Sequence, residues 1–145
     1  MPGTKRTGRC LYGAVQFAAT LPQETFSVCH CGMCRRWRAG PFLSAHANGP
    51  VEILAGAAVL TWYRGSAWAE RGFCARCGTS LFYRLANRPE RFTGVSVEAF
   101  DEADGFTLDR HLFVDAQPAR YAFADDRPRV TEAAALAEFE SAPEE

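Results

Sequence analysis

Long apolar runs are missing from this sequence of 145 residues, and neither acidic nor basic residues are in clear excess. No segment approaches the ~20 apolar residues that a membrane-spanning helix needs. The N-terminal MPGTKRTGRC is positively charged, but no apolar core follows it, so we expect no secretory signal and a cytoplasmic protein. A formal net charge of −1 gives no general attraction to nucleic acids or acidic lipids, so we expect neither as a partner.

Helical periodicity is also scarce before the C-terminus, whereas short apolar runs broken by Gly, Pro and Asn are frequent. This pattern is typical of an antiparallel, mainly β fold. The runs predict strands at residues 10–19, 24–29, 42–47, 51–54, 59–63, 68–74, 80–85, 92–97 and 111–114. Because we find no internal repeat and no linker, the sequence predicts a single domain over residues 1–145.

Two helical segments are nevertheless expected. One helical turn is predicted at residues 34–39, directly after a group of cysteines. The second segment is the alanine-rich TEAAALAEFES at residues 131–141, where Thr131 is suited to cap the helix N-terminus. Residues 131–145 are therefore interpreted as a short C-terminal helical tail.

The chain contains six cysteines, which form two tight groups and one outlier. They are Cys10, Cys29, Cys31, Cys34, Cys74 and Cys77. In a reducing cytosol, closely spaced cysteines indicate metal binding or catalysis and not a disulfide framework.

Cys74 and Cys77 form a CxxC turn that is followed by Gly78. Such a turn brings two sulfur atoms to one point, and the glycine can adopt the positive φ that a tight turn requires. A redox role for CxxC would need a βαβ setting, which the strand pattern does not show. The motif therefore predicts half of a metal site.

The second group, Cys29, Cys31 and Cys34, has the pattern CxCxxC. Strand alternation places the first two sulfurs on one face, while His30 points the other way, where a hydrogen bond is its expected role. Three protein ligands with an open fourth position are typical of catalytic zinc. A thiol that entered this position would lose its proton readily and become a nucleophile for an aldehyde. Structural ligation and a redox pair remain alternatives for these cysteines.

Several short motifs together resemble the glutathione-dependent formaldehyde-activating enzyme family, also called the centromere-protein-V-like family. The matching stretches are Gly8-Arg9-Cys10, Gly13-Ala14-Val15, Cys29-His30-Cys31, Cys34-Arg35-Arg36, Gly40-Pro41-Phe42, Phe73-Cys74-Ala75-Arg76-Cys77-Gly78-Thr79 and His111-Leu112-Phe113-Val114-Asp115. The resemblance runs from about Gly8 to about Val130 and depends on the order and spacing of these motifs.

This resemblance implies a zinc-containing β-tent fold of small antiparallel sheets. It also implies a structural zinc site made by Cys10, Cys74 and Cys77, and a second, catalytic site made by Cys29, Cys31 and Cys34. The implied activity is addition of glutathione to formaldehyde, or the reverse carbon–sulfur cleavage. Zn²⁺ is thus the expected cofactor and glutathione the expected co-substrate.

One position departs from the family pattern. The family usually has a second N-terminal cysteine where this chain has Tyr12, which leaves the first site with three thiolates. A phenol, with a pKa near ~10, is a rare zinc ligand. A water, a histidine or a cysteine of the other cluster would complete the shell, or cysteines of both clusters would share one ion. We therefore expect one or two zinc ions per chain.

Arginines flank the second cluster, and Arg35 and Arg36 are the expected binding residues for glutathione. Glutathione carries two carboxylates, which suit guanidinium groups, although a solvated polar surface is the alternative for any one arginine. His111 either lines the same pocket or packs in the core.

Two function classes follow from these features. The first is a zinc-dependent carbon–sulfur lyase acting on a small-molecule thiol and aldehyde. The second is a non-catalytic binding module that uses zinc only as scaffold. A third option, beyond these two, is a thiol-redox protein. The charge argues mildly against nucleic-acid contacts, and the arginines near the cluster argue mildly for a ligand pocket.

Overall fold

The computed structural model describes residues 3–141, with side chains up to residue 139. The described residues form two compact units. Unit 1 contains residues 3–24 and 45–106, and unit 2 contains residues 25–44 and 107–141. The chain therefore passes from one unit to the other three times, at residues 24–25, 44–45 and 106–107.

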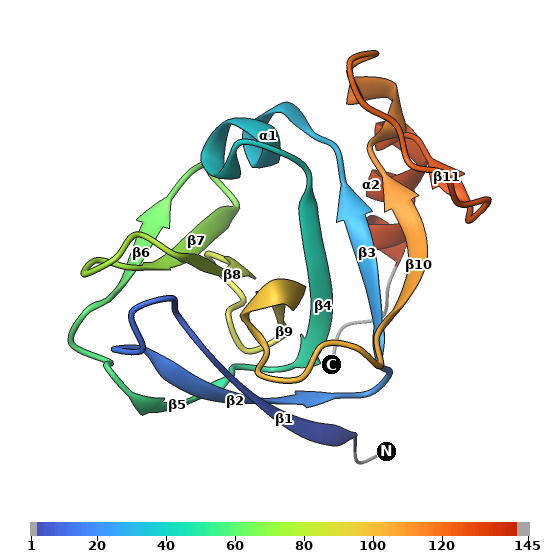
Figure 1. Cartoon of the computed structure of the whole chain (residues 1–145). Coiled ribbons are helices and arrows are strands. Elements are labelled where there is room, and N and C mark those ends of the chain that lie inside the picture. The colour runs from blue at the N-terminus through green and yellow to red at the C-terminus, as the bar shows by residue number, and fades with distance from the viewer. Residues whose placement is uncertain (1–2, 142–145) are drawn as a thin grey trace. The chain divides into compact units, whose positions relative to one another are not determined.

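Unit 1 contains a small antiparallel sheet of β1 (Thr4–Arg9), β2 (Gln16–Leu21) and β5 (Glu52–Ala55), in the order β1-β2-β5 (Figure 1). Its core lies on β2, where Phe17 is fully buried. Gly8 of β1 pairs with Phe17, and a Cβ at Gly8 would lie only 2.5 Å from the Phe17 ring. Only glycine lets the ring pack this closely to the neighbouring strand.

A second run of paired strands has the order β4, β9, β8, β7 and β6, and β4 begins in unit 2 and continues into unit 1 at Ala45. Their bounds are Phe42–Asn48, Phe92–Ser96, Ser80–Leu85, Ala69–Cys74 and Leu60–Arg64, and β9 is followed by the short helix η1 (Val97–Ala99). The described pairings among β6, β7, β8 and β9 are antiparallel. Phe82 of β8 packs edge-on against Phe17 of β2 at 4.9 Å between ring centroids, and this contact joins the two sheets of unit 1.

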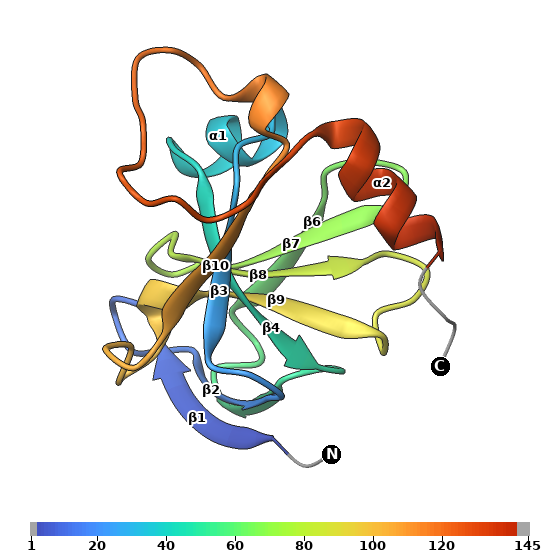
Figure 2. The same ribbon diagram turned by 90° about the vertical axis from the view of Figure 1, so that its right-hand side faces the viewer.

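Unit 2 is built on parallel pairing. β10 (Thr107–Leu112) lies beside β3 (Thr25–Cys29) and β11 (Arg129–Val130), and both pairs are parallel (Figures 1 and 2). The helix α1 (Gly32–Arg38) follows β3, and the short helix η2 (Val114–Ala116) follows β10. This arrangement places the ends of β3 and β10 next to each other.

The C-terminal helix α2 (Glu132–Ser141) belongs to unit 2 and begins where the sequence predicts. Thr131 Oγ1 accepts the backbone N–H of Ala134 at 3.2 Å, which confirms Thr131 as the N-cap. Arg110 of β10 donates to both carboxylate oxygens of Glu138, at 2.8 and 2.9 Å. The cap and this ion pair hold α2 to the unit. The predicted tail beyond residue 141 lies outside the described residues.

The prediction of a mainly β fold with a short C-terminal helix is confirmed. Two strands, β1 and β11, were not predicted, and β10 begins four residues before the predicted run at residues 111–114. The parallel pairing of β3 with β10 also differs from the expected antiparallel pattern. The predicted turn at residues 34–39 is a helix of seven residues that starts at Gly32.

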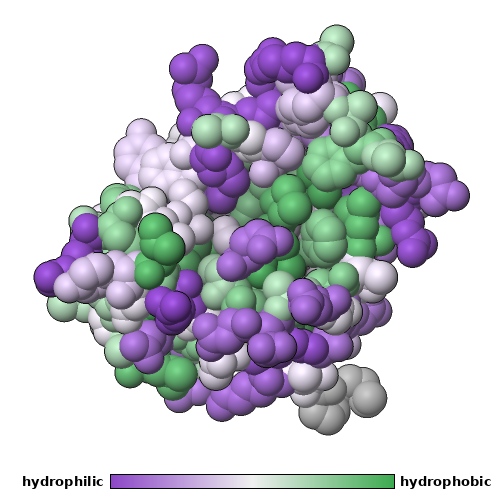
Figure 3. All heavy atoms as spheres, in the orientation of Figure 1, coloured by the Kyte–Doolittle hydropathy of each residue, from purple (hydrophilic) through white to green (hydrophobic). Residues whose placement is uncertain are grey.

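Among residues 3–141, no helix has both the length and the apolar character that crossing a bilayer requires. Hydrophilic and hydrophobic residues are interspersed on the face shown in Figure 3. Leu11 and Tyr12, in the loop after β1, are among the exposed large hydrophobic residues, with Leu11 84% exposed. The same loop contains Cys10 and lies beside the turn that carries Cys74 and Cys77.

Candidate metal centres and the neighbouring cleft

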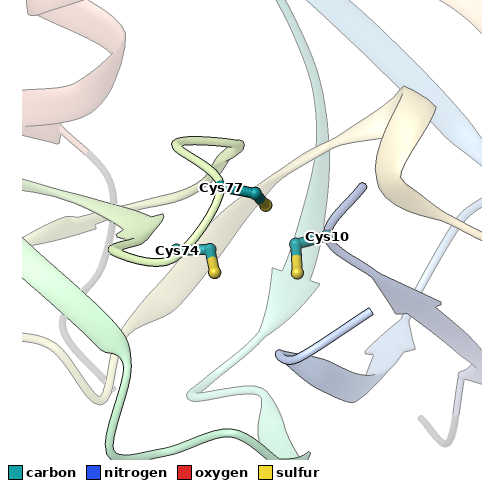
Figure 4. A group of neighbouring side chains, drawn as sticks. All are labelled: Cys10, Cys74 and Cys77. Carbon is teal, nitrogen blue, oxygen red and sulfur yellow. The ribbon is translucent and has the colours of Figure 1, made fainter. Parts of the chain in front are cut away.

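The first candidate centre is a cysteine triad in unit 1, formed by Cys10, Cys74 and Cys77. Cys10 follows β1, Cys74 is the last residue of β7, and Cys77 lies in the turn before β8. Their sulfur atoms all lie within 4.8 Å of one another, and Figure 4 shows the three side chains gathered around one point. Cys10 and Cys74 are buried, whereas Cys77 is exposed.

Hydrogen-bond donors surround the sulfur atoms of this triad. The backbone N–H of Val15 donates to Cys10 Sγ at 3.3 Å. Thr79 Oγ1 lies 3.2 Å from Cys77 Sγ, and this hydroxyl, together with the backbone N–H groups of Tyr12 and Thr79, lowers the pKa of Cys77 to about 6 although burial opposes the shift. Donors directed at sulfur favour the thiolate, which is the form that binds metals.

The turn between Cys74 and Cys77 has the geometry that the sequence predicts. Gly78 has φ +82°, so the glycine after the second cysteine does take the left-handed conformation. The N–H of Gly78 donates to the Cys74 carbonyl at 2.7 Å, which closes the turn. Burial raises the pKa of the Cys74 thiol, although the backbone N–H groups of Cys77 and Arg76 oppose the shift.

The second candidate centre is a triad in unit 2, formed by Cys29, Cys31 and Cys34, whose sulfur atoms also lie within 4.8 Å of one another. Cys29 ends β3, Cys31 is the N-cap of α1, and Cys34 lies buried in the first turn of that helix. The neighbouring sulfurs of Cys31 and Cys34, and then burial, raise the pKa of Cys29. Three thiolates this close together repel one another, so all three can be deprotonated only when a bound cation neutralises their charge.

Both triads fit a thiolate-bound metal ion. Tetrahedral zinc with Zn–S bonds of about 2.3 Å separates its sulfur ligands by roughly 3.8 Å, which agrees with sulfurs gathered within 4.8 Å. The three cysteines of each triad belong to the same unit. This favours two metal sites, one per triad, over a single ion shared by both clusters.

A cleft of about 920 Å³ lies in unit 2, and Gly32, Met33 and Arg35, the chain neighbours of Cys31 and Cys34, are among the residues that line it. One wall is α1 and the turn after it, from Gly32 to Pro41, and the other is Arg120 with Tyr121. Arg35, Arg36 and Arg120 bring three guanidinium groups to this cleft. The volume lies within the range of small-molecule sites, and the charge suits an anionic ligand.

Hydrogen-bonded polar side chains, of which the two histidines are buried and the other two half-buried, connect the cleft to the end of β10. Tyr121 Oη lies 2.8 Å from His30 Nδ1, and His30 Nε2 lies 2.9 Å from His111 Nδ1. His111 Nε2 lies 2.9 Å from Asp125 Oδ1. Burial, and then the charges of His111, Arg129 and Arg35, lower the pKa of His30 to about 4. Both histidines are hydrogen-bonded, and both are at most 1% exposed.

The structure gathers the predicted cysteines into the two triads and places Arg35 and Arg36 on the cleft. Arg38, in contrast, lies over the ring of Phe42 at 3.7 Å. Sequence reasoning missed Arg120, Tyr121 and Asp125, which lie in the irregular segment between η2 and β11. No periodicity or spacing marks them, because their role depends on the fold bringing that segment back to β3.

Comparisons with known proteins agree with these features. The family model described as glutathione-dependent formaldehyde-activating enzyme matches residues 5–116. An uncharacterized lyase of Schizosaccharomyces pombe is 30% identical over 118 residues, which cover 81% of this chain and 85% of that protein. A Halomonas elongata protein, provisionally named a glutathione-dependent formaldehyde-activating enzyme, is 30% identical over 91 residues, or 57% of this chain and 58% of that protein.

One solved structure shows the same fold. The crystal structure of a Rhodobacter sphaeroides protein matches 70% of this chain and 98% of its own chain, with a TM-score of 0.59. The sequence identity is 24%, so this likeness concerns the fold alone.

Proposed function

The chain belongs to the glutathione-dependent formaldehyde-activating enzyme family, and on this basis we propose that it is a zinc-dependent carbon–sulfur lyase. In this proposal it adds glutathione or a similar thiol to formaldehyde or another small aldehyde, or catalyses the reverse cleavage. The observation that supports the proposal is the position of Cys34, Arg35 and Arg36 on one helix, α1, with both arginines on the cleft. In this proposal a metal ligand and the groups that bind the thiol's carboxylates therefore share one short helix.

The chain's residues have distinct roles in this reaction. Cys29, Cys31 and Cys34 would hold the metal, and zinc bound there would supply positive charge that favours the thiolate form of a thiol. Arg35 and Arg36 bind the thiol's carboxylates and orient it in the cleft. The charged carboxylates thus fix the position of the otherwise flexible thiol.

The reaction balances without an oxidant or reductant. In the forward direction a sulfur–carbon bond forms and the carbonyl π electrons move to oxygen. The proton lost by the thiol ends on that oxygen. The protein therefore needs only to favour the thiolate and to hold the two reactants close together, which are charge stabilisation and positioning effects.

The other triad has a structural role in this proposal. Cys10, Cys74 and Cys77 connect the end of β1 to the β7–β8 turn within unit 1, and two of the three are buried. A metal ion there would hold these segments together, as structural zinc sites do.

The decisive experiment is a metal count per chain beside formaldehyde consumption with glutathione, in wild type and Cys31→Ser. We expect Cys31→Ser to lose metal and to fall to the uncatalysed rate. Cys77→Ser is the matched control, because it removes one thiolate from the other triad. It should also lose metal but keep most of its turnover per folded molecule.

Two results would contradict the proposal. If Cys31→Ser keeps all its metal, these cysteines are not its ligands. If wild type binds zinc but its turnover never exceeds background with any thiol and aldehyde, the alternative of a zinc-scaffolded binding module is favoured.

A further inference from the structure

The short link between β3 and α1 carries the backbone of the second triad, and a side chain of the helix reaches back to hold it (Figure 1). The backbone N–H of His30, in this link, donates to the Leu112 carbonyl of β10 at 3.0 Å. The His30 carbonyl accepts from Arg35 Nε, also at 3.0 Å. The helix leaves this carbonyl to Arg35, because the N–H of Cys34, four residues further on, donates to Cys31 Sγ at 3.3 Å.

The orientation of the His30 carbonyl decides where Cys31 lies relative to Cys29. This carbonyl belongs to the planar peptide group that precedes Cys31, so a rotation of the plane changes ψ of His30 and φ of Cys31 together. Cys31 has φ −63° and ψ 155°, and its sulfur lies within 4.8 Å of the Cys29 and Cys34 sulfurs. The hydrogen bond from Arg35 Nε therefore fixes the link between two candidate metal ligands.

The Arg35 guanidinium also belongs to the cleft, which it lines together with Arg36. A guanidinium has its N–H donors in one rigid plane, so Nε can hold the His30 carbonyl while the Nη groups bind a carboxylate in the cleft. A carboxylate on the Nη groups fixes that plane, and with it the direction of the Nε–H. Arg36 lines the cleft from an exposed position, whereas Arg35 is half-buried.

We propose that Arg35 is a positioning residue that couples the cleft to the second triad. An anion bound in the cleft holds Arg35 against the His30 carbonyl, which strengthens metal binding by the triad. Such coupling is reciprocal, so anion binding is strengthened by the same factor when the metal is loaded. The metal is then held most tightly while the cleft is occupied. This inference rests on the proposed function, because it takes the triad as a metal site and the cleft as the anion site.

The coupling factor is measured on the full chain with Cys77→Ser, which weakens the first triad so that the second one gives the main signal. The probe anion is γ-glutamyl-alanyl-glycine, which has the carboxylates of glutathione but no sulfur to offer to a metal. Co²⁺ titrations follow the thiolate-to-cobalt absorption with and without saturating probe. We expect the probe to raise the Co²⁺ affinity of the second triad about five- to tenfold.

The reciprocal measurement uses the same protein. Calorimetric titration of the probe into the metal-free and the Co²⁺-loaded forms should show tighter binding to the loaded form, by the same factor. If the probe binds but leaves Co²⁺ affinity unchanged or lowers it, the inference is overturned. This outcome needs no substitution at position 35, so it does not depend on whether such a variant folds.

Arg35→Lys and Arg36→Lys are the matched variants, because each keeps the positive charge and removes one planar guanidinium. A lysine ammonium lacks the rigid fork that serves a backbone carbonyl and a ligand carboxylate together. For Arg35→Lys we expect Co²⁺ affinity without probe to fall about tenfold and the coupling factor to fall to about one. Arg36→Lys should bind the probe more weakly but keep both the Co²⁺ affinity and the coupling factor.

The coupling factor separates positioning from a merely structural role. If Arg35 only stabilises α1, Arg35→Lys lowers Co²⁺ affinity but keeps the coupling factor of the parent protein, which contradicts the inference. Equal loss of coupling in both lysine variants also contradicts it, because the effect would then not belong to Arg35.

Failure of this inference can be separated from failure of the proposed function. If metal and probe both bind, but independently, Arg35 does not couple the two sites, and the lyase proposal is untouched. If the second triad binds no metal, or the cleft binds no anion, both proposals fail. These binding measurements need no aldehyde, so they do not depend on turnover.

Discussion

Cys31 accepts the backbone N–H of Cys34 on its sulfur at 3.3 Å, so one candidate metal ligand is also the N-cap of α1. Metal binding and the start of the helix are therefore coupled through a single side chain. A serine at this position supplies a capping oxygen in place of the sulfur, whereas an alanine supplies no acceptor.

This relationship predicts a difference between two substitutions that both remove the thiolate. Metal-free Cys31→Ser should be more stable than metal-free Cys31→Ala by about 1 kcal/mol, the usual value of an N-cap. Urea unfolding of both variants under reducing conditions measures the difference. Equal stabilities would show that the Cys31 cap contributes nothing to α1.

Arg36 gives the second prediction, because its exposed guanidinium lines the cleft. Arg36→Ala should raise the KM for glutathione about three- to tenfold, as expected for the loss of a charge-assisted contact, and leave kcat nearly unchanged. The KM for the uncharged thiol 2-mercaptoethanol should not change. Arg64→Ala, an exposed arginine of unit 1, is the matched control, and a similar effect in that variant would contradict a specific role for Arg36.

The cysteine groups could be predicted from sequence because their geometry is local. In CxCxxC and CxxC, strand alternation and one turn decide where the sulfurs point, so few residues suffice. The left-handed Gly78 and the Thr131 cap are predictable for the same reason. The features that the sequence predicted correctly are those whose conformation depends on only four or five consecutive residues.

Other features could not be predicted, because they depend on pairing across the chain. β1 reads TKRTGR, without apolar alternation, and becomes a strand by pairing with β2. β10 contains a register shift between Leu108 and Arg110, which hides its period. Tyr121 and Asp125 lie in irregular backbone, and only the return of that segment to His30 and His111 gives them a role.

Ala39 ends α1 with φ 62° and ψ 28°, a left-handed conformation that glycine adopts without strain. Ala39→Gly should therefore raise the free energy of unfolding by about 0.5–1 kcal/mol. Ala39→Val should lower it, because a β-branched residue is disfavoured in this conformation. Denaturant unfolding of the three proteins tests the order, and a destabilised Ala39→Gly would contradict the explanation.

Asp125 predicts a pH dependence of stability. Although burial opposes the charge, the hydrogen bonds from His111 and from the Arg127 N–H lower the pKa of Asp125 from 3.8 to about 2. Because the folded-state pKa is the lower one, this stabilisation is present above pH 3.8 and is lost as the pH falls through 2. Between these values wild type should lose more stability than Asp125→Asn, in which this carboxylate is absent.

The control is Asp126→Asn, which removes the same charge from the exposed neighbour. The free energies of unfolding are compared as differences from wild type at each pH, so acid release of metal cancels to first order. A parallel decline of wild type and Asp125→Asn would argue against an ionised Asp125 held by these hydrogen bonds.

Tyr12 offers a test of the first triad. Its backbone N–H donates to Cys77 Sγ, so the main chain at position 12 already lies against the candidate metal site. Its ring points elsewhere, toward Arg76, with the guanidinium 4.5 Å from the ring centroid. A cysteine at position 12 would add a fourth thiolate to Cys10, Cys74 and Cys77. Tyr12→Cys should therefore release zinc to a chelator at least tenfold more slowly, because a closed four-ligand site has no open position for attack.

Cobalt substitution supplies a second readout, since the absorption of Co²⁺ changes when a fourth thiolate replaces an oxygen ligand. Tyr12→Ser is the matched control, because it removes the ring without adding sulfur. Turnover with glutathione and formaldehyde should be the same in all three proteins, because the lyase proposal assigns chemistry to the other triad. If Tyr12→Cys changes neither zinc release nor the cobalt spectrum, then position 12 does not face the metal site, and a group other than residue 12 completes its shell.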